Sequence, residues 1–207
     1  MSRAMGPRLQ LLLIAGLFVV PVLVAWLVVF SGWRPAGSTN HGRLLEPPVL
    51  TATEGWRTPA GDPAGPVLAG YWTLLAVAPE GCASQCQELL DWLRRVRLAL
   101  NDDAARVQVV LALGRRAEPP QIPAVTVLQV PPPQLAELAA DAAGQSTGLL
   151  VVDFRGYRMM TYPLPLDGEG LLEDLERLLR ASGEDVENFE RSRAAETGAA
   201  PTRTEPK

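Results

Sequence analysis

Residues 71–86 decide the fold, and they read YWTLLAVAPEGCASQC. The run from Tyr71 to Ala78 is almost entirely apolar, which is typical of a strand covered on both faces of a sheet. A short turn and a Cys-x-x-x-Cys spacing follow, and Cys82 and Cys86 are the only cysteines of the chain. An amphipathic helix begins there, so both sulfurs are expected at a helix N-terminus, where the helix dipole stabilises a thiolate. The stretch predicts thiol or soft-metal chemistry at the end of a buried strand.

The residues after the cysteines predict a strand-helix-strand unit. Apolar side chains recur there at three- and four-residue spacing, which marks one buried helix face: Cys86, Leu89, Leu93, Val96 and Leu100. A second apolar run, 107–113, predicts the next buried strand. Two strands joined through one helix form a β-α-β unit with a right-handed crossover.

The second half of the domain alternates in the same way. It predicts a strand over 125–130, and a helix that three prolines open and that runs from 131 to about 142. Strands over 149–153 and 157–162 are separated by three residues, which predicts an antiparallel hairpin. A final helix is expected over 168–181. This order of elements predicts an α/β fold of the thioredoxin type.

The first 33 residues predict a short cytoplasmic stub and a single transmembrane helix. No charged side chain occurs in the 22 residues from Leu9 to Phe30, a length that spans the roughly 30 Å hydrocarbon core. A cleaved signal peptide is the alternative, but its apolar region is usually only about 7–15 residues long. Arg3 and Arg8 favour a cytoplasmic N-terminus. The expected location is therefore the bacterial inner membrane, with the globular domain in the periplasm.

The rest of the chain divides by composition. Residues 34–66 are rich in turn-forming residues and predict a docked linker, 67–182 the thioredoxin-like domain, and 183–207 a disordered tail. A net charge of −4 and a pI near 5.1 argue against nucleic acid as a partner.

Three segments of the predicted domain form a recognisable set: residues 72–86, the sequence GLLVVDFRG at 148–156 and LLEDLERLL at 171–179. They resemble the SCO/SenC family of membrane-tethered thioredoxin-like proteins. NHGRLLEPP at 40–48 is similar to the short transmembrane SCO-like proteins of proteobacteria associated with haem-copper oxidase assembly. The resemblance covers 40–182. It implies that the protein assists cytochrome c oxidase assembly. The partners it implies are the membrane, the subunits of that oxidase and its assembly factors.

The same resemblance implies that Cys82 and Cys86 are the catalytic thiols, or the thiolates that hold copper. In that family a distant histidine completes the copper site, and its nearest counterpart here is around Gln145. The only histidine of the chain is His41, which is a weak candidate ligand. We therefore expect Cu(I), which two soft thiolates suit, rather than Cu(II).

Two other functions remain open on the sequence. A general thiol-disulfide oxidoreductase of the thioredoxin type carries a cis-proline before its third core strand, whereas Ser-Thr-Gly precedes Leu149 here. A scaffold that has lost copper binding is the other alternative. A purely structural disulfide is less attractive, because so short a loop contributes well under the roughly 3 kcal/mol of a 15-residue loop.

Overall fold

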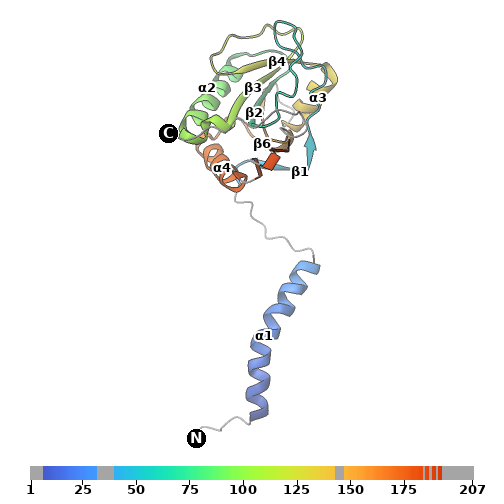
Figure 1. Cartoon of the computed structure of the whole chain (residues 1–207), viewed down its shortest axis with the longest axis vertical. Helices are drawn as coiled ribbons and strands as arrows, with labels where there is room; N and C mark the ends of the chain where they lie inside the picture. Colours follow the sequence, from blue (N-terminus) through green and yellow to red (C-terminus); the bar gives the residue numbers. More distant parts are fainter. Residues whose placement is uncertain are drawn as a thin grey trace. The chain divides into compact units, whose positions relative to one another are not determined.

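A computed structural model describes residues 7–31, 40–142, 147–183, 185–186, 188–189 and 191–192 (Figure 1). The chain divides into two compact units, Met1–Thr39 and Asn40–Lys207. The first unit contains α1 (Pro7–Phe30), a helix with Pro21 in its interior and apolar side chains exposed along its length. No helix in the described ranges has both the length and the apolar character needed to cross a membrane.

The second unit is built on a six-stranded mixed sheet with the order β1-β6-β5-β2-β3-β4. The strands are β1 (Arg43–Leu50), β2 (Trp72–Ala78), β3 (Val107–Gly114), β4 (Thr126–Val130), β5 (Gly148–Val152) and β6 (Tyr157–Tyr162). The helices are α2 (Ser84–Ala99), a 3-10 helix (Asn101–Arg106), α3 (Pro132–Asp141) and α4 (Gly168–Ala181).

The pairing of the strands confirms the predicted connections. Strands β2 and β3 are parallel and joined through α2, while β5 and β6 form the antiparallel hairpin. In the hairpin turn, Asp153 Oδ1 accepts hydrogen bonds from the backbone N–H groups of Arg155 and Tyr157. Gly156 has a φ of 95°, a conformation that strongly favours glycine.

Helices cover both faces of the sheet, as Figure 1 shows. Alternate residues of β2 point to opposite faces: Leu74 and Ala76 join the cluster under α2 and α4, whereas Leu75 and Val77 join the one under α3. Because both faces are covered, every residue of β2 and β5 is buried. This explains why their sequences are continuous apolar runs rather than alternating ones.

Strand β1 was not predicted from the sequence. It lies in the segment 34–66 that we interpreted as a linker, and it pairs antiparallel with β6 at the sheet edge. Pro47 and Pro48 lie inside it, and proline is tolerated in strands mainly at such edges. Trp56 from the same segment is 1% exposed and donates its indole N–H to Gln134 Oε1 at 2.8 Å. Residues 40–66 therefore belong to the globular unit.

The start of the predicted tail also differs from expectation. The described residues 185–186, 188–189 and 191–192 are helical rather than disordered. Phe189 packs against Phe154 with ring centroids 5.5 Å apart, which gives this short segment an apolar contact with the core. The tail positions 184, 187, 190 and 193–207 lie outside the described residues.

Two buried charged side chains connect strands to helices in this unit. Arg158 on β6 is 2% exposed and pairs with Glu137 and Asp141 of α3. On the other face, Asp174 of α4 is 1% exposed. Its Oδ2 accepts hydrogen bonds from the Tyr162 hydroxyl and from two backbone N–H groups just before β1. Asp174 thereby fixes the edge strand to the last helix.

Candidate functional site

The cysteine pair lies where β2 passes into α2. Gly81 in the connecting turn has a φ of 120°, which lets the chain reverse before Cys82. Helix α2 begins two residues after Cys82, at Ser84, so Cys82 lies in the turn and Cys86 in the first turn of the helix. Both cysteines therefore lie at the helix N-terminus, as predicted. The two residues form a disulfide with their Cα atoms 5.0 Å apart, within the range that a disulfide requires.

The two sulfurs differ in accessibility. Cys86 is fully buried and belongs to the apolar face of α2, whereas Cys82 is half-buried. An attacking group from solvent therefore reaches the disulfide at Cys82. The N-terminus of α2 has no side-chain cap, which leaves backbone N–H groups free to stabilise negative charge on a nearby sulfur.

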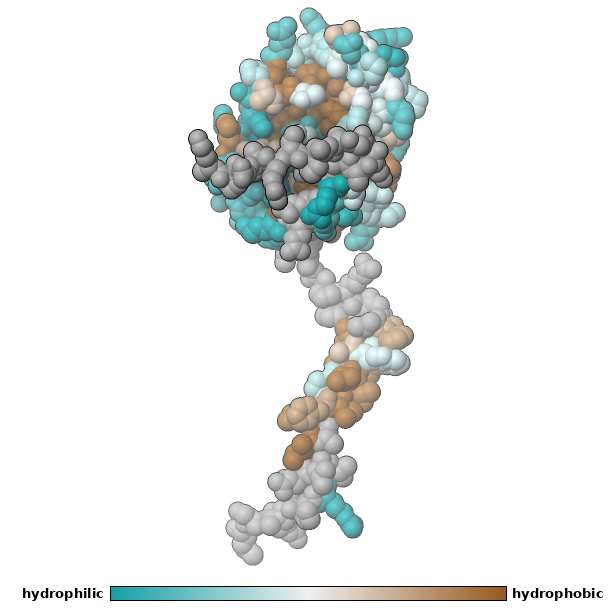
Figure 2. Space-filling view, in the orientation of Figure 1, coloured by the Kyte–Doolittle hydropathy of each residue, from teal (hydrophilic) through white to brown (hydrophobic). Residues whose placement is uncertain are grey.

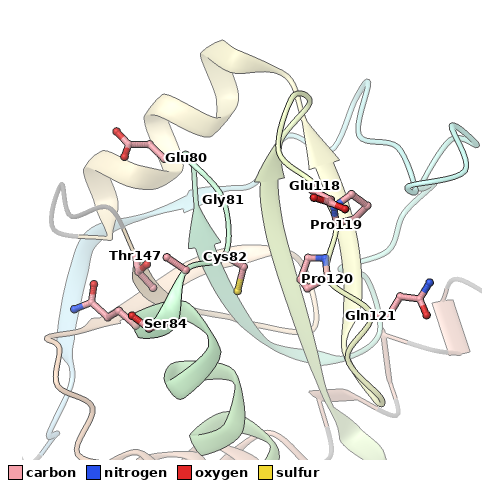
Figure 3. Close-up of a pocket in the computed structure, with 11 residues that line it drawn as sticks. Glu80, Gly81, Cys82, Ser84, Glu118, Pro119, Pro120, Gln121 and Thr147 are labelled. Atoms are coloured by element: carbon pink, nitrogen blue, oxygen red, sulfur yellow. The ribbon is translucent and has the colours of Figure 1, made fainter.

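Cys82 lines a cleft of about 770 Å³. Figure 3 shows its sulfur facing the loop that joins β3 to β4, from which Glu118, Pro119, Pro120 and Gln121 line the opposite side. The turn before Cys82 contributes Glu80 and Gly81, and the start of α2 contributes Ala83, Ser84 and Gln85. The cleft thus combines an accessible disulfide with a polar rim and a proline-rich wall.

Thr147 closes the cleft just before β5 and is 4% exposed. This is the place where the thioredoxin-type enzymes described above carry a cis-proline. The cis peptide bonds in the described part of the chain precede Pro47 and Pro165 instead. Gln145, the expected counterpart of the SCO histidine, lies outside the described residues.

His41 does not line the cleft of Cys82. Its ring lies beside α4, with Nε2 3.1 Å from Glu173 Oε2 and Nδ1 3.8 Å from Asp167 Oδ2. Its backbone N–H donates to the buried carboxylate of Asp174 at 2.8 Å. His41 therefore contributes to the junction between β1 and α4, and its role as a metal ligand stays a prediction.

The donor set around the cysteines is small. Among the described residues, no group of three or more histidine, cysteine, aspartate or glutamate side chains is arranged to hold a metal ion. Met160, whose thioether is a donor that Cu(I) accepts, is buried in the core at 1% exposure. After reduction, Cys82 and Cys86 would supply two thiolates, a donor set that suits Cu(I) and lacks the nitrogen ligands that Cu(II) favours.

Sequence reasoning missed the wall of the cleft opposite Cys82. Glu118 and the prolines after it carry no periodic signal, and only the folding of the β3–β4 loop against the turn brings them to the cysteine. Asp174 was also missed. Its signal was present, because it lies between Leu171 and Leu175 on the buried stripe of α4, where an unpaired carboxylate would be costly.

Comparison with known protein families assigns the fold. The model of the family described as transmembrane-like, thioredoxin-like, C-terminal domain matches residues 72–182. The chain belongs to this family. The match runs from the first residue of β2 to just beyond the end of α4. It therefore includes the cysteine pair, the residues of the cleft and the strands β2 to β6. No curated protein matches the chain significantly.

Solved structures with a similar arrangement include Sco proteins. BsSco, a member of the Sco family of cytochrome c oxidase assembly proteins, is 11% identical over 65% of this chain and 96% of its own, with a TM-score of 0.46. Copper-bound ScoI from Bradyrhizobium japonicum is 18% identical over 63% and 96%, with a TM-score of 0.45. A SCO1/SenC family lipoprotein from Bacillus anthracis is 13% identical over 65% and 98%, with a TM-score of 0.46. The fold assignment itself rests on the family match and the strand order.

Proposed function

We propose that this chain is a membrane-anchored, periplasmic SCO-like protein that assists haem-copper (cytochrome c) oxidase assembly through the redox chemistry of Cys82 and Cys86. One observation carries the proposal. The disulfide lies at the N-terminus of α2 with Cys82 open to a cleft and Cys86 buried. The resemblance to SCO/SenC sequences over 40–182 directs that chemistry toward an oxidase.

The chemistry follows from the difference between the two sulfurs. A thiolate of the client, meaning the protein whose thiols are exchanged, attacks Cys82 because Cys86 is shielded. Cys86 then leaves as a thiolate beside the free N–H groups of the first helical turn, which favour the charged sulfur. The site therefore supports reversible exchange between disulfide and dithiol.

Cu(I) handling is a second form of the same function. The reduced pair offers two soft donors, and Cu(I) accepts such a low-coordinate site. The position of His41 beside Glu173 supports a site without its imidazole. In this form copper is cargo that the dithiol receives and passes on.

Membrane anchoring is supported by the uncharged stretch from Leu9 to Phe30 and by the exposed apolar side chains along α1. Figure 2 shows these as a largely apolar surface on the described part of the helix. The proposed topology is a single pass with the domain in the periplasm, the compartment in which a two-cysteine disulfide persists.

The test is oxidase assembly in cells that lack the chain. Complementation with the wild-type gene should restore oxidase activity, whereas Cys82→Ser and Cys86→Ser should each fail to restore it at equal protein level. If both variants restore activity fully, the chain acts as a scaffold and the proposal is wrong. If the loss instead extends to many periplasmic disulfide proteins, general thiol-disulfide exchange is the better account.

A further inference from the structure

The cleft beside Cys82 is acidic. Glu80 lies on the turn before Cys82 and Glu118 lies on the facing loop, so the two residues line the cleft from opposite sides (Figure 3). Both residues are exposed, and neither carboxylate has an ion-pair or hydrogen-bond partner among the described residues. No lysine or arginine from the described ranges lines the cleft. Among the described residues, the lining of the cleft therefore holds two carboxylates and no cationic side chain.

The arginines closest in sequence to Glu118 do not line the cleft. Arg115 Nη2 donates to the Gly55 carbonyl at 3.3 Å, so its guanidinium lies against the segment before β2. Arg116 is exposed and is not part of the cleft lining.

An apolar hollow of about 560 Å³ adjoins the same β3–β4 loop. The cleft and the hollow share Pro119, Pro120 and Gln121, and the hollow is completed by apolar residues of the same loop and of β4: Ile122, Pro123, Val125 and Val127, with Pro59 at its edge. Figure 2 shows apolar residues gathered over β3 and β4 and surrounded by hydrophilic ones. Because proline fixes φ, this wall is held in shape before any partner binds. Together the cleft and the hollow can accommodate an extended segment.

We propose that the cleft selects its client by charge, and that it takes an extended segment whose reactive cysteine is flanked by lysine or arginine. The segment extends past the proline wall with an apolar side chain in the adjoining hollow. The inference rests on the proposed thiol exchange at Cys82 and names the class of thiol that it serves. Clients with acidic residues beside the cysteine are repelled by Glu80 and Glu118.

The exchange requires only the two thiols of the client and the Cys82–Cys86 disulfide, and atoms and electrons balance between them. A client thiolate attacks Cys82 Sγ, a client–Cys82 disulfide forms, and the Cys82–Cys86 bond breaks with Cys86 leaving as a thiolate. A second client thiolate attacks the client sulfur of the mixed disulfide and releases Cys82. The client loses two electrons and becomes a disulfide, and the pair gains two electrons and takes up two protons as a dithiol.

The test uses the oxidised full-length protein in neutral detergent and three dithiol peptides that differ only at the residues flanking the first cysteine. These residues are lysine, glutamine or glutamate. Each rate of peptide oxidation is divided by that peptide's rate with hydroxyethyl disulfide, a neutral reagent, because charges near a thiol also change its own reactivity. At low salt we expect the lysine peptide to react about five- to tenfold faster than the glutamate peptide. At about 0.5 M salt the ratio should fall below about twofold.

A pair of variants separates the cleft from the overall negative charge of the chain. The double variant Glu80→Gln, Glu118→Gln should lose most of the preference. Asp102→Asn should keep it, because exposed Asp102 lies beyond the far end of α2, and that end is roughly 20 Å from Cys86. Equal corrected rates for the three peptides, or a preference that survives in the double variant, would overturn this inference and leave thiol exchange standing. Oxidation of none of the peptides would overturn the exchange function as well.

Discussion

Cys82 and Cys86 differ in burial although they are only four residues apart. After reduction, alkylation with iodoacetamide should therefore modify Cys82 first, because Cys86 lies on the apolar face of α2 and is buried in the core. Mass spectrometry of quenched samples measures the order. Cys82→Ser is the matched control and should show slow modification of the remaining thiol. Faster labelling of Cys86 in the wild-type protein would contradict the assignment of Cys82 as the attacked sulfur.

The copper preference is also decided by individual side chains. The reduced protein should bind Cu(I), and either Cys82→Ser or Cys86→Ser should abolish binding, because two thiolates are the soft donors at this place. His41→Ala should leave Cu(I) binding nearly unchanged, since its ring contacts Glu173 and Asp167 rather than the cleft. Competition with a Cu(I) chelator measures both.

Binding of Cu(II) should be weak or absent. Stoichiometric Cu(II) binding that disappears in His41→Ala would show that the segment before β1 rearranges to complete a three-ligand site. Failure of the wild-type protein to bind either oxidation state would remove copper handling and leave thiol exchange or a scaffold role.

Strand β1 depends on α4 through one carboxylate. Asp174→Ala would leave the backbone N–H groups of His41 and Gly42 and the Tyr162 hydroxyl without their acceptor. We expect a loss of about 2–4 kcal/mol in the free energy of unfolding, because the lost acceptor is charged and two of its partners, Gly42 and Tyr162, are buried. Urea unfolding measures the change. Glu176→Ala, a half-exposed position on the same helix, should cost less than about 0.5 kcal/mol.

The same junction predicts a sensitivity to alkaline pH. Burial first, and then the hydrogen bond to Asp174, raise the pKa of Tyr162 far above its ordinary value near 10. Above about pH 10 the unfolded chain loses this proton while the folded chain keeps it, so stability falls as pH rises.

The comparison variant is Tyr162→Phe, which has no proton to lose. Its decline in stability above about pH 10 should be shallower than that of the wild type by up to about 1.4 kcal/mol per pH unit. Urea unfolding at several pH values gives both slopes, and equal slopes would contradict the role of Tyr162.

At the scale of the whole molecule, residues 1–33 are predicted to hold the protein in the membrane. Deletion of these residues should abolish carbonate-resistant membrane association, because the uncharged stretch from Leu9 to Phe30 would be lost. Truncation after Ser192 is the control and should leave the association intact. Persistent carbonate-resistant association of the deleted form would show that another part of the chain holds it to the membrane.

The sequence by itself determined the elements whose signal is local. Continuous apolar runs identified β2, β3 and β5, and a three- and four-residue spacing identified the buried faces of α2 and α4, because burial on a sheet or a helix imposes those periods. The Cys-x-x-x-Cys spacing after a buried strand likewise placed the thiols at the start of α2, where the structure has them.

Only the tertiary structure decided the features that depend on distant contacts. Strand β1 exists because the edge of β6 accepts it and Asp174 fixes the residues before it, 132 or more positions away in sequence. The acidic cleft exists because the β3–β4 loop faces the turn before Cys82. Such features leave little trace in local sequence, since their stability comes from partners that the chain meets only after folding.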